Sequence, residues 1–176
     1  VFATSFSGEI YHYDGVQWHT MQSSTEEPLY DIWGSGPQDV YAVGLNSTIT
    51  HYDGKTWKTA YRGESGRTLT GIWGLSRNNV YVVGDGGLIL HYDGNGWREQ
   101  TSGVDTNLTS VWGADADNIY VVGDHGTFLK SDDTGWRIVS VGPMEDDTLL
   151  SVWGDSRSEE RRVGLVGGGG GGGGGV

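Results

Sequence analysis

The chain has 176 residues, enough for one domain with a sizeable core, and it carries a formal net charge of −12. This acidic balance disfavours binding to nucleic acid, whose phosphates attract clusters of lysine and arginine. The lack of cysteine excludes disulfides and thiolate chemistry. The sequence also has no apolar run as long as the roughly twenty residues of a membrane-spanning helix.

Residues 1–28 predict three short strands. Val1–Ser5 is an apolar, β-prone run, the turn sequence His12-Tyr-Asp-Gly15 is followed by Trp18, and Thr25–Pro28 forms a linking loop. Each later copy of this pattern has one additional strand at its start. We therefore expect the segment to be the last three strands of a four-stranded unit, and we interpret the N-terminus as a truncation.

The pattern then recurs in full over residues 29–66, 67–105 and 106–147. Within each copy, short β-prone runs are separated by glycine, aspartate and asparagine, which tolerate the positive φ of tight turns. In the middle copy these runs are Leu69–Trp73, Val80–Val83, Leu88–Tyr92 and Trp97–Thr101. Trp-Gly pairs, spaced by 40, 39 and 41 residues, mark the first run of a copy; they are Trp33-Gly34, Trp73-Gly74, Trp112-Gly113 and Trp153-Gly154.

Residues 148–154 repeat the start of the pattern, but the rest of the copy is missing. From Asp155 onward, charged residues replace the expected apolar run, and nine glycines follow at Gly167–Gly175. Because such a composition cannot bury a core, residues 155–176 are expected to be disordered. Ser158–Gly164 also resembles translated adaptor sequence, so we interpret this aberrant tail as an artefact.

Four antiparallel strands repeated about every forty residues are typical of a β-propeller blade. The runs are too short, and too often interrupted by glycine, to form amphipathic helices. The sequence therefore predicts an all-β protein, with about four propeller blades over residues 1–154 that are part of a larger propeller. The alternative is a closed four-bladed ring, in which Leu149–Trp153 supplies the strand that the N-terminal unit lacks.

The repeat resembles several known propeller families. Val80-Tyr-Val-Val-Gly84, followed by Tyr92 and Trp97, is similar to a kelch blade, and Ser131–Trp136 resembles an Asp-box turn. Ile10–Trp18 resembles a tectonin repeat, the unit of some propeller lectins. The whole pattern is most similar to the Trp-Gly and Tyr-Asp-Gly repeats of bacterial surface and secreted propellers. This resemblance implies a location outside the cell or in the bacterial cell envelope.

The eight tryptophans all occupy repeat positions. A lectin could stack such residues on sugar rings. Packing between neighbouring blades, however, explains a tryptophan that is kept at one register in every copy and buries a large area. We therefore interpret the tryptophans as packing residues.

The Asp-Gly turns at Asp14, Asp53 and Asp93 are also interpreted as structural, because a turn carboxylate accepts hydrogen bonds from nearby backbone N–H groups. A glycoside hydrolase needs two carboxylates that converge on one sugar. Turn carboxylates one blade apart point away from each other, and no repeat position collects the arginines that a sialidase-like site would need. No catalytic residues are predicted.

No cofactor is predicted either. His12, His51 and His91 share one register on the third strand of each copy, so they are not expected to meet at one metal ion. The carboxylates at Asp115–Asn118 and Glu145–Asp147 are weak candidates for calcium. Neither segment has an EF-hand frame, and solvated acidic loops are common.

The connections that differ between copies point to a binding face. In a propeller, the loop from one blade's fourth strand to the next blade opens on the same face as the turn between the second and third strands. Loops carry specificity, whereas strand pairing constrains the repeated residues. We therefore predict a ligand site on this loop face, formed by Asn46, Arg62, Glu64, Arg67, Asp85, Asp105, Asn107, Asp124 and His125.

These observations predict a non-catalytic binding or scaffold module. Its expected partner is a protein or a carbohydrate on the loop face, with no nucleic acid and no membrane span. Two alternatives stay open: a tectonin-like, carbohydrate-binding propeller, and a fragment of an Asp-box glycoside hydrolase whose catalytic residues lie in missing blades.

Overall fold

The computed structural model describes residues 1–140 and 146–155, and this part of the chain is all-β with two short 3₁₀ turns. The strands form one three-stranded and three four-stranded antiparallel sheets, in sequence order. They are β1 (Phe2–Thr4), β2 (Ile10–Tyr13), β3 (Trp18–Met21), β4 (Leu29–Gly36), β5 (Asp39–Gly44), β6 (Thr48–Tyr52), β7 (Trp57–Arg62), β8 (Leu69–Ser76), β9 (Asn79–Gly84), β10 (Ile89–Tyr92), β11 (Trp97–Gln100), β12 (Leu108–Asp115), β13 (Asn118–Gly123), β14 (Phe128–Asp132) and β15 (Gly135–Ile138).

The predicted propeller fold is confirmed, because each full copy of the repeat forms one four-stranded sheet in simple up-and-down order. The first strand of each copy is longer than predicted. In the middle copy it continues past Trp73 to Ser76, because pairing with β9 extends to the pair Ser76 and Asn79. Within the described residues, no helix is long and apolar enough to cross a lipid bilayer.

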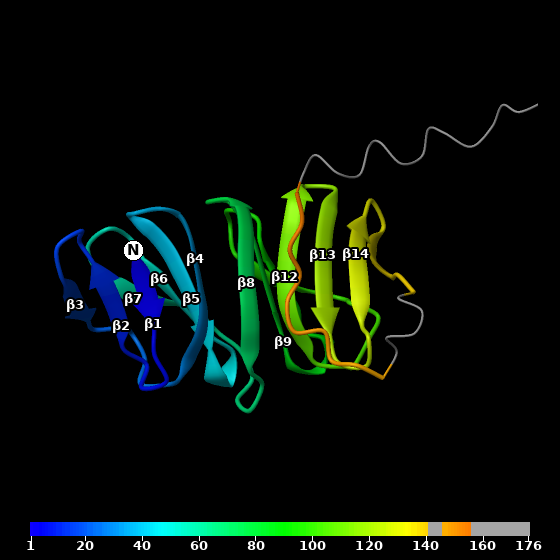
Figure 1. Cartoon of the computed structure of the whole chain (residues 1–176), viewed down its shortest axis with the longest axis horizontal. Helices are drawn as coiled ribbons and strands as arrows, with labels where there is room; N and C mark the ends of the chain where they lie inside the picture. Colours follow the sequence, from blue (N-terminus) through cyan, green and yellow to red (C-terminus); the bar gives the residue numbers. More distant parts are fainter. Residues whose placement is uncertain (141–145, 156–176) are drawn as a thin grey trace, which may run out of the picture.

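The sheets lie side by side in a row, with the first strands β4, β8 and β12 next to one another (Figure 1). Leu149–Gly154 continues this row beside β12, where the Val152 N–H donates to the hydroxyl of Ser110 at 3.4 Å, and the Leu149 N–H donates to the carbonyl of Gly123 at the end of β13 at 3.0 Å. The first sheet, β1 to β3, lies at the opposite end. Leu149–Trp153 therefore does not complete the first sheet of its own chain, as the four-bladed alternative required. Residues 156–176, most of the predicted tail, lie outside the described residues.

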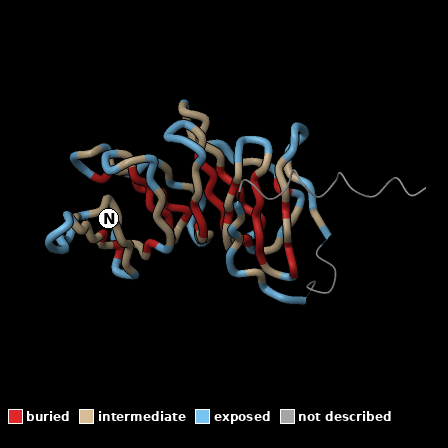
Figure 2. The backbone as a smooth tube through the Cα atoms, turned by 45° about the horizontal axis from the view of Figure 1, so that its top comes forward, coloured by how far each residue is buried: buried red, intermediate tan, exposed pale blue. Residues whose placement is uncertain are grey.

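The core lies between the sheets, which explains why the second strand of each copy is apolar throughout. In β9, Val80 and Val82 pack toward the preceding sheet, whereas Tyr81 and Val83 pack toward the following one. Burial follows these strands through the middle of the molecule (Figure 2). Each fully buried valine, leucine or isoleucine contributes about 1.5–3 kcal/mol to folding.

The repeated Trp-Gly pair is a contact between neighbouring sheets. The indole of Trp33 lies over Gly74 so closely that a Cβ atom there would be 2.5 Å from its Cη2 atom. Trp73 covers Gly113 in the same way, and Trp112 covers Gly154, with corresponding separations of 2.6 and 2.8 Å. Glycine is therefore required next to each tryptophan because the preceding sheet's tryptophan occupies the space of a side chain.

Candidate functional site

The loop face consists of the described linking loops 22–28, 62–68 and 101–107 and the turns 45–47, 85–87 and 124–126. These segments lie together along one end of the sheets, at the bottom of Figure 1. The predicted residues are therefore on one face. Part of the last linking loop, residues 141–145, lies outside the described chain.

The turns of this face are hydrogen-bonded to the linking loops on both sides. The Asp85 N–H donates to the Thr68 carbonyl at 2.9 Å, and the Thr68 N–H donates to Oδ2 of Asp85 at 2.7 Å. On the other side, the Gly87 N–H donates to the Thr106 carbonyl at 2.7 Å, and Oδ1 of Asn107 accepts from the Gly86 N–H at 3.1 Å. Asp85 and Asn107, both predicted as ligand residues, thus bind protein backbone.

Three more of the predicted residues stabilise the loops in the same way. Oδ1 of Asn46 accepts from the Gly66 N–H at 2.8 Å, and Oδ2 of Asp124 accepts from Nδ2 of Asn107 at 3.0 Å. The guanidinium of Arg67 donates to the Asp85 carbonyl at 3.1 Å and lies 3.6 Å from a carboxylate oxygen of Glu99. These side chains therefore link neighbouring loops of the loop face to one another.

The remaining predicted residues, Arg62, Glu64, Asp105 and His125, are exposed. His125 has a φ of 54°, as Asn46 (55°) and Gly86 (61°) have at the same turn position. A left-handed residue is thus needed at the tip of each turn, which gives His125 a conformational role.

Among the described residues of this face, two hollows open between the loops. One, of about 680 Å³, is bordered by Gly86, Glu99 and the loop from Thr101 to Asp105. The other, of about 460 Å³, is bordered by residues 22–27 and Arg62. The predicted site included Asp105 and Arg62 but missed Glu26, Glu27 and Glu99. The repeat register could have identified Glu26 and Glu27, because loop 22–28 occupies the same place in its copy as loop 62–68.

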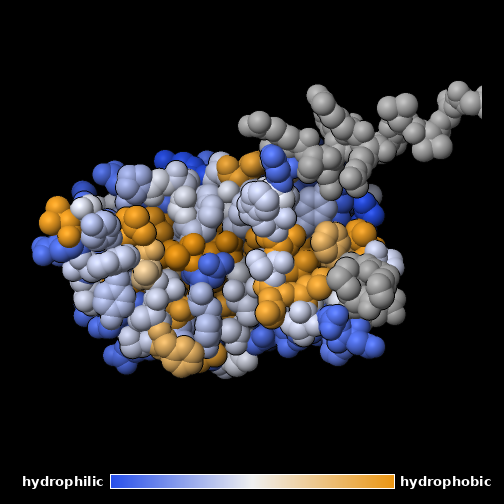
Figure 3. Space-filling view, viewed as in Figure 1, coloured by the Kyte–Doolittle hydropathy of each residue, from blue (hydrophilic) through white to orange (hydrophobic). Residues whose placement is uncertain are grey.

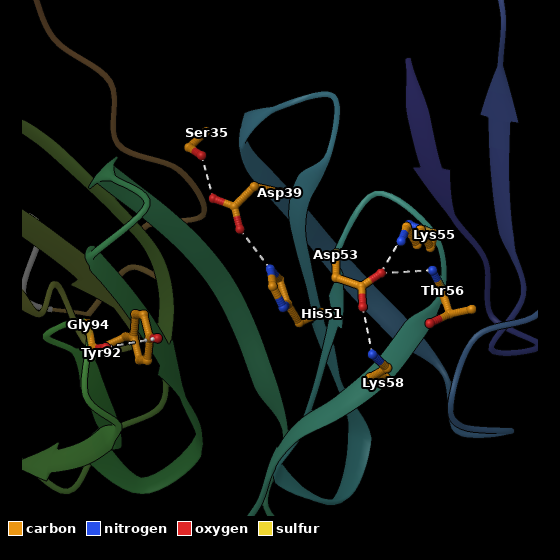
Figure 4. Close-up of polar contacts among 9 residues, drawn as sticks. All are labelled: Ser35, Asp39, His51, Asp53, Lys55, Thr56, Lys58, Tyr92 and Gly94. Carbon is orange, nitrogen blue, oxygen red and sulfur yellow. Dashed lines mark hydrogen bonds and ion pairs between the residues drawn. The ribbon is translucent and has the colours of Figure 1, made fainter.

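The opposite face carries the Asp-Gly turns, whose carboxylates are bound within the turn as predicted. Oδ1 of Asp53 accepts from the N–H groups of Lys55 and Thr56 at 3.0 and 2.9 Å, while Oδ2 pairs with Nζ of Lys58 at 2.6 Å (Figure 4). The hydrogen bond from Lys58, together with the backbone N–H groups, holds the pKa of Asp53 well below its ordinary value. Asp14, Asp93 and Asp132 have depressed pKa values for the same kinds of reason.

These turns predict a loss of stability in acid. Because the folded-state pKa values of Asp14, Asp53, Asp93 and Asp132 lie below those of the unfolded chain, their contribution is present above about pH 4 and is lost as the pH falls further. Replacing all four by asparagine keeps an oxygen acceptor but removes the titration. The free energy of unfolding, measured in urea from neutral pH into acid, should fall less steeply for this variant than for the wild type. Parallel profiles for variant and wild type would contradict the assignment.

The third-strand histidines take part in contacts within their own sheets. The ring of His51 stacks on Tyr41 with centroids 4.2 Å apart, and its Nε2 lies 2.7 Å from Oδ1 of Asp39. The other carboxylate oxygen of Asp39, Oδ2, accepts from the hydroxyl of Ser35 (Figure 4). His91 repeats this arrangement with Tyr81 and Asn79. Each histidine therefore fixes a pair of neighbouring strands, and the histidines do not converge.

The part of the chain that the structure describes contains no group of three metal-ligating side chains suited to an ion. In the calcium candidate at Asp115–Asn118, both oxygens of Asp115 accept from the side-chain amide of Asn118, and Oδ1 also accepts from the N–H of Asp117. This carboxylate therefore closes a local turn. Of the second candidate, Glu145 lies outside the described residues.

The fourth-strand tryptophans also pack between sheets. Trp57, Trp97 and Trp136 meet the second-strand aromatics Phe2, Tyr41 and Tyr81 of the preceding sheet edge-on, with centroids 5.9–6.1 Å apart. Both sets of tryptophans are thus used in contacts between blades. The packing interpretation therefore holds for every tryptophan that the described chain places against a neighbouring sheet.

A buried indole N–H at Trp57 predicts a stabilising substitution. Nε1 of Trp136 donates to Gln100 at 2.8 Å, but Nε1 of the buried Trp57 has no partner among the described residues, because Met21 occupies the position equivalent to Gln100. Met21→Gln should raise the free energy of unfolding by about 1 kcal/mol by supplying the acceptor. Met21→Leu, which supplies none, is the control in urea unfolding. Equal stability of the two variants would contradict the prediction.

Comparison with known proteins supports the fold. A solved structure described as YCF48 bound to D1 peptide matches with a TM-score of 0.59 and 18% identity, over 72% of this chain and 44% of that one. YCF48 from Cyanidioschyzon merolae matches with a TM-score of 0.56 and 14% identity, over 76% of this chain and 50% of that one. The chain thus spans about half the length of these structures. No protein-family model and no curated protein sequence matches the chain.

Proposed function

We propose that the chain is a non-catalytic β-propeller module that binds an extended, positively charged segment of a partner protein on its loop face. The observation that carries this proposal is the pair of hollows on that face and the carboxylates around them. Glu26 and Glu27 outnumber the one cation, Arg62, at the border of one hollow, and Asp105 borders the other together with Glu99, which pairs with Arg67. A cationic partner would complement this charge.

Three further observations support a binding role. The hydrogen bonds between turns and loops hold the face in one conformation, which lowers the entropic cost of binding. Exposed backbone and carboxylate oxygens can accept hydrogen bonds from an extended peptide. One of the similar structures is a propeller described as bound to a peptide, so the fold is compatible with this kind of ligand.

The other candidate functions have less support. Sugar binding through stacked tryptophans would compete with the packing that holds Trp57, Trp97 and Trp136 between sheets. A hydrolase would need free, converging carboxylates, whereas Asp14, Asp53 and Asp93 are each bound within their own turn. Location outside the cell or in the bacterial cell envelope stays a prediction from the repeat.

The test is binding of a fluorescently labelled, lysine-rich peptide, followed by anisotropy at increasing salt. Reversing one charge at each hollow with Glu26→Lys and Asp105→Lys should weaken binding by about tenfold or more and reduce its salt dependence. The matched control, Asp117→Lys with Asp133→Lys, makes the same change in net charge on the opposite face and should leave binding intact. Equal losses in both variants, or equal binding of an acidic peptide, would contradict the proposal. Glycan-array binding with no peptide binding would favour the lectin alternative.

A further inference from the structure

The turn between β10 and β11 differs from the equivalent turns of the two preceding copies. It reads Asp93-Gly-Asn-Gly96, whereas Val-Gln at 16–17 and Lys-Thr at 55–56 follow the Asp-Gly of the other two turns. Asn95 is therefore followed by glycine, and the sequence contains one such Asn-Gly pair. In this pair the backbone nitrogen can attack the preceding side-chain amide most readily, because glycine has no Cβ to shield the nitrogen and restrict its approach.

The backbone of this turn is also held by fewer and longer hydrogen bonds than its equivalents. In the turn of Asp53, the Asp53 N–H donates to the Thr56 carbonyl at 3.3 Å, and the Thr56 N–H donates to Oδ1 of Asp53 at 2.9 Å. The turn of Asp14 closes in the same way, at 3.2 and 2.9 Å. The Gly96 nitrogen, in contrast, lies 3.3 Å from Oδ1 of Asp93, and within the described residues the Asp93 N–H makes no bond to the Gly96 carbonyl.

The side chain of Asn95 is accessible and unrestrained. Asn95 is exposed, and its side-chain amide has no hydrogen-bond partner in the part of the chain that the structure describes. A Cβ atom built on Gly96 would meet nothing within 4 Å, so no neighbouring group crowds the nitrogen. Four other asparagine side chains are hydrogen-bonded; they are Asn46, Asn79, Asn107 and Asn118.

Water can reach this end of the molecule. The Asp-Gly turns lie at the end of the sheets opposite the loop face, which is the upper end in Figure 1. Apolar side chains form a band across the face that carries the first strands, and hydrophilic surface lines the upper and lower rims (Figure 3). A reaction that consumes water is therefore not hindered by burial at the turn.

We propose that Asn95 is a site of spontaneous covalent modification, at which the side-chain amide becomes a carboxylate by way of a cyclic imide. The backbone nitrogen of Gly96 attacks Cγ of Asn95 and gives its proton to solvent, while the Cγ–Nδ2 bond breaks and Nδ2 takes up a proton and leaves as ammonia. Water then opens the imide. Attack at Cγ gives aspartate, whereas attack at the main-chain carbonyl gives isoaspartate, in which the main chain runs through Cγ. One water is consumed, one ammonia is released, and nothing is oxidised or reduced.

The isoaspartate product disturbs a contact between sheets. It adds one methylene group to the main chain between Tyr92 and Trp97, which pair directly across the turn. The ring of Trp97 meets Tyr41 of the preceding sheet edge-on, with centroids 5.9 Å apart. We therefore expect the isoaspartate form to be less stable, whereas the aspartate form keeps the normal main chain. Because the turn lies on the face opposite the loop face, this inference does not depend on the proposed ligand.

Peptide mapping by mass spectrometry, after incubation of the full chain at mildly alkaline pH, tests the proposal. The peptide that contains Asn95 should gain the mass of one deamidation, and an isoaspartyl methyltransferase should label part of it. Gly96→Ala keeps Asn95 but shields the attacking nitrogen, and it should slow the conversion by about tenfold or more. The peptides that contain Asn46, Asn107 and Asn118 are internal controls and should stay unmodified. Equal rates in the wild type and Gly96→Ala, or equal conversion of the control asparagines, would overturn the proposal.

Incubation in urea separates the effect of the fold from that of the sequence. Local opening of an exposed turn costs little free energy, so Asn95 in the folded protein should convert less than about tenfold more slowly than in the unfolded chain. An Asn95 that reacts in urea but stays intact in the folded protein would rule the site out.

The aged protein tests the expected loss of stability. The isoaspartate form, separated by ion exchange, should unfold at a lower urea concentration than Asn95→Asp, which carries the same charge on a normal main chain. Equal midpoints would contradict the disturbed contact of Trp97.

Discussion

Gly84→Ala is expected to destabilise the fold by about 3 kcal/mol or more, although it adds only one methyl group. The Cβ atom would overlap the carbonyl oxygen of Thr68 and lie 3.1 Å from Cα of Leu69. Both are backbone atoms at the start of β8, so neither can move without breaking the pairing of Leu69 with Gly84. The φ of Gly84 is −173°, which any residue can adopt, and the cost is therefore steric. Urea unfolding followed by tryptophan fluorescence measures it.

Gly96→Ala is the matched control for this prediction. Gly96 lies in a turn of the same sheet, and a Cβ atom there meets nothing within 4 Å. The substitution should leave stability unchanged or raise it by about 0.5 kcal/mol, because alanine restricts the unfolded chain. If both variants lose little stability, the close approach of β9 to the Thr68 carbonyl is not a feature of the folded protein.

The strands were predictable because their residues repeat and their contacts are local. Val80–Val83 is apolar throughout, and the structure shows why: both faces of β9 are buried, against the sheet before and the sheet after. The Trp-Gly pair also identified the contact between blades, although the pattern alone did not reveal that the tryptophan of one copy covers the glycine of the next. That relation depends on the distance between neighbouring sheets, which the sequence of one repeat does not determine.

The candidate site was less predictable, because variation between copies was its only signal. Asn46 and Asn107 differ from copy to copy as ligand residues would, and Asp85 recurs as Asp124 but is replaced by Leu45 in another copy. All three nevertheless bind backbone of adjacent loops 17 to 21 residues away in sequence. Such contacts depend on how two loops meet across a blade boundary. The sequence correctly assigned Asp53 to its turn, since that carboxylate binds N–H groups only two and three residues ahead.

Trp73→Ala should cost about 3 kcal/mol, near the lower end of the range for removing a packed tryptophan. The indole joins two sheets, because it lies against Gly113 in β12 while Trp73 itself pairs with Tyr81 in β9. Its removal leaves a cavity that the rigid backbone of Gly113 cannot fill. Urea unfolding, read by far-ultraviolet circular dichroism so that the lost fluorophore does not matter, gives the difference in free energy.

Leu75→Ala on the same strand distinguishes packing between sheets from a general sensitivity of β8. Leu75 is 43% exposed, so its truncation should change the free energy of unfolding by less than about 0.5 kcal/mol. A sugar-binding role for Trp73 predicts the reverse of the first result, with stability kept and ligand binding lost. A stable Trp73→Ala protein would therefore contradict the packing role and reopen the lectin alternative, whereas a large loss shows that this tryptophan holds neighbouring blades together.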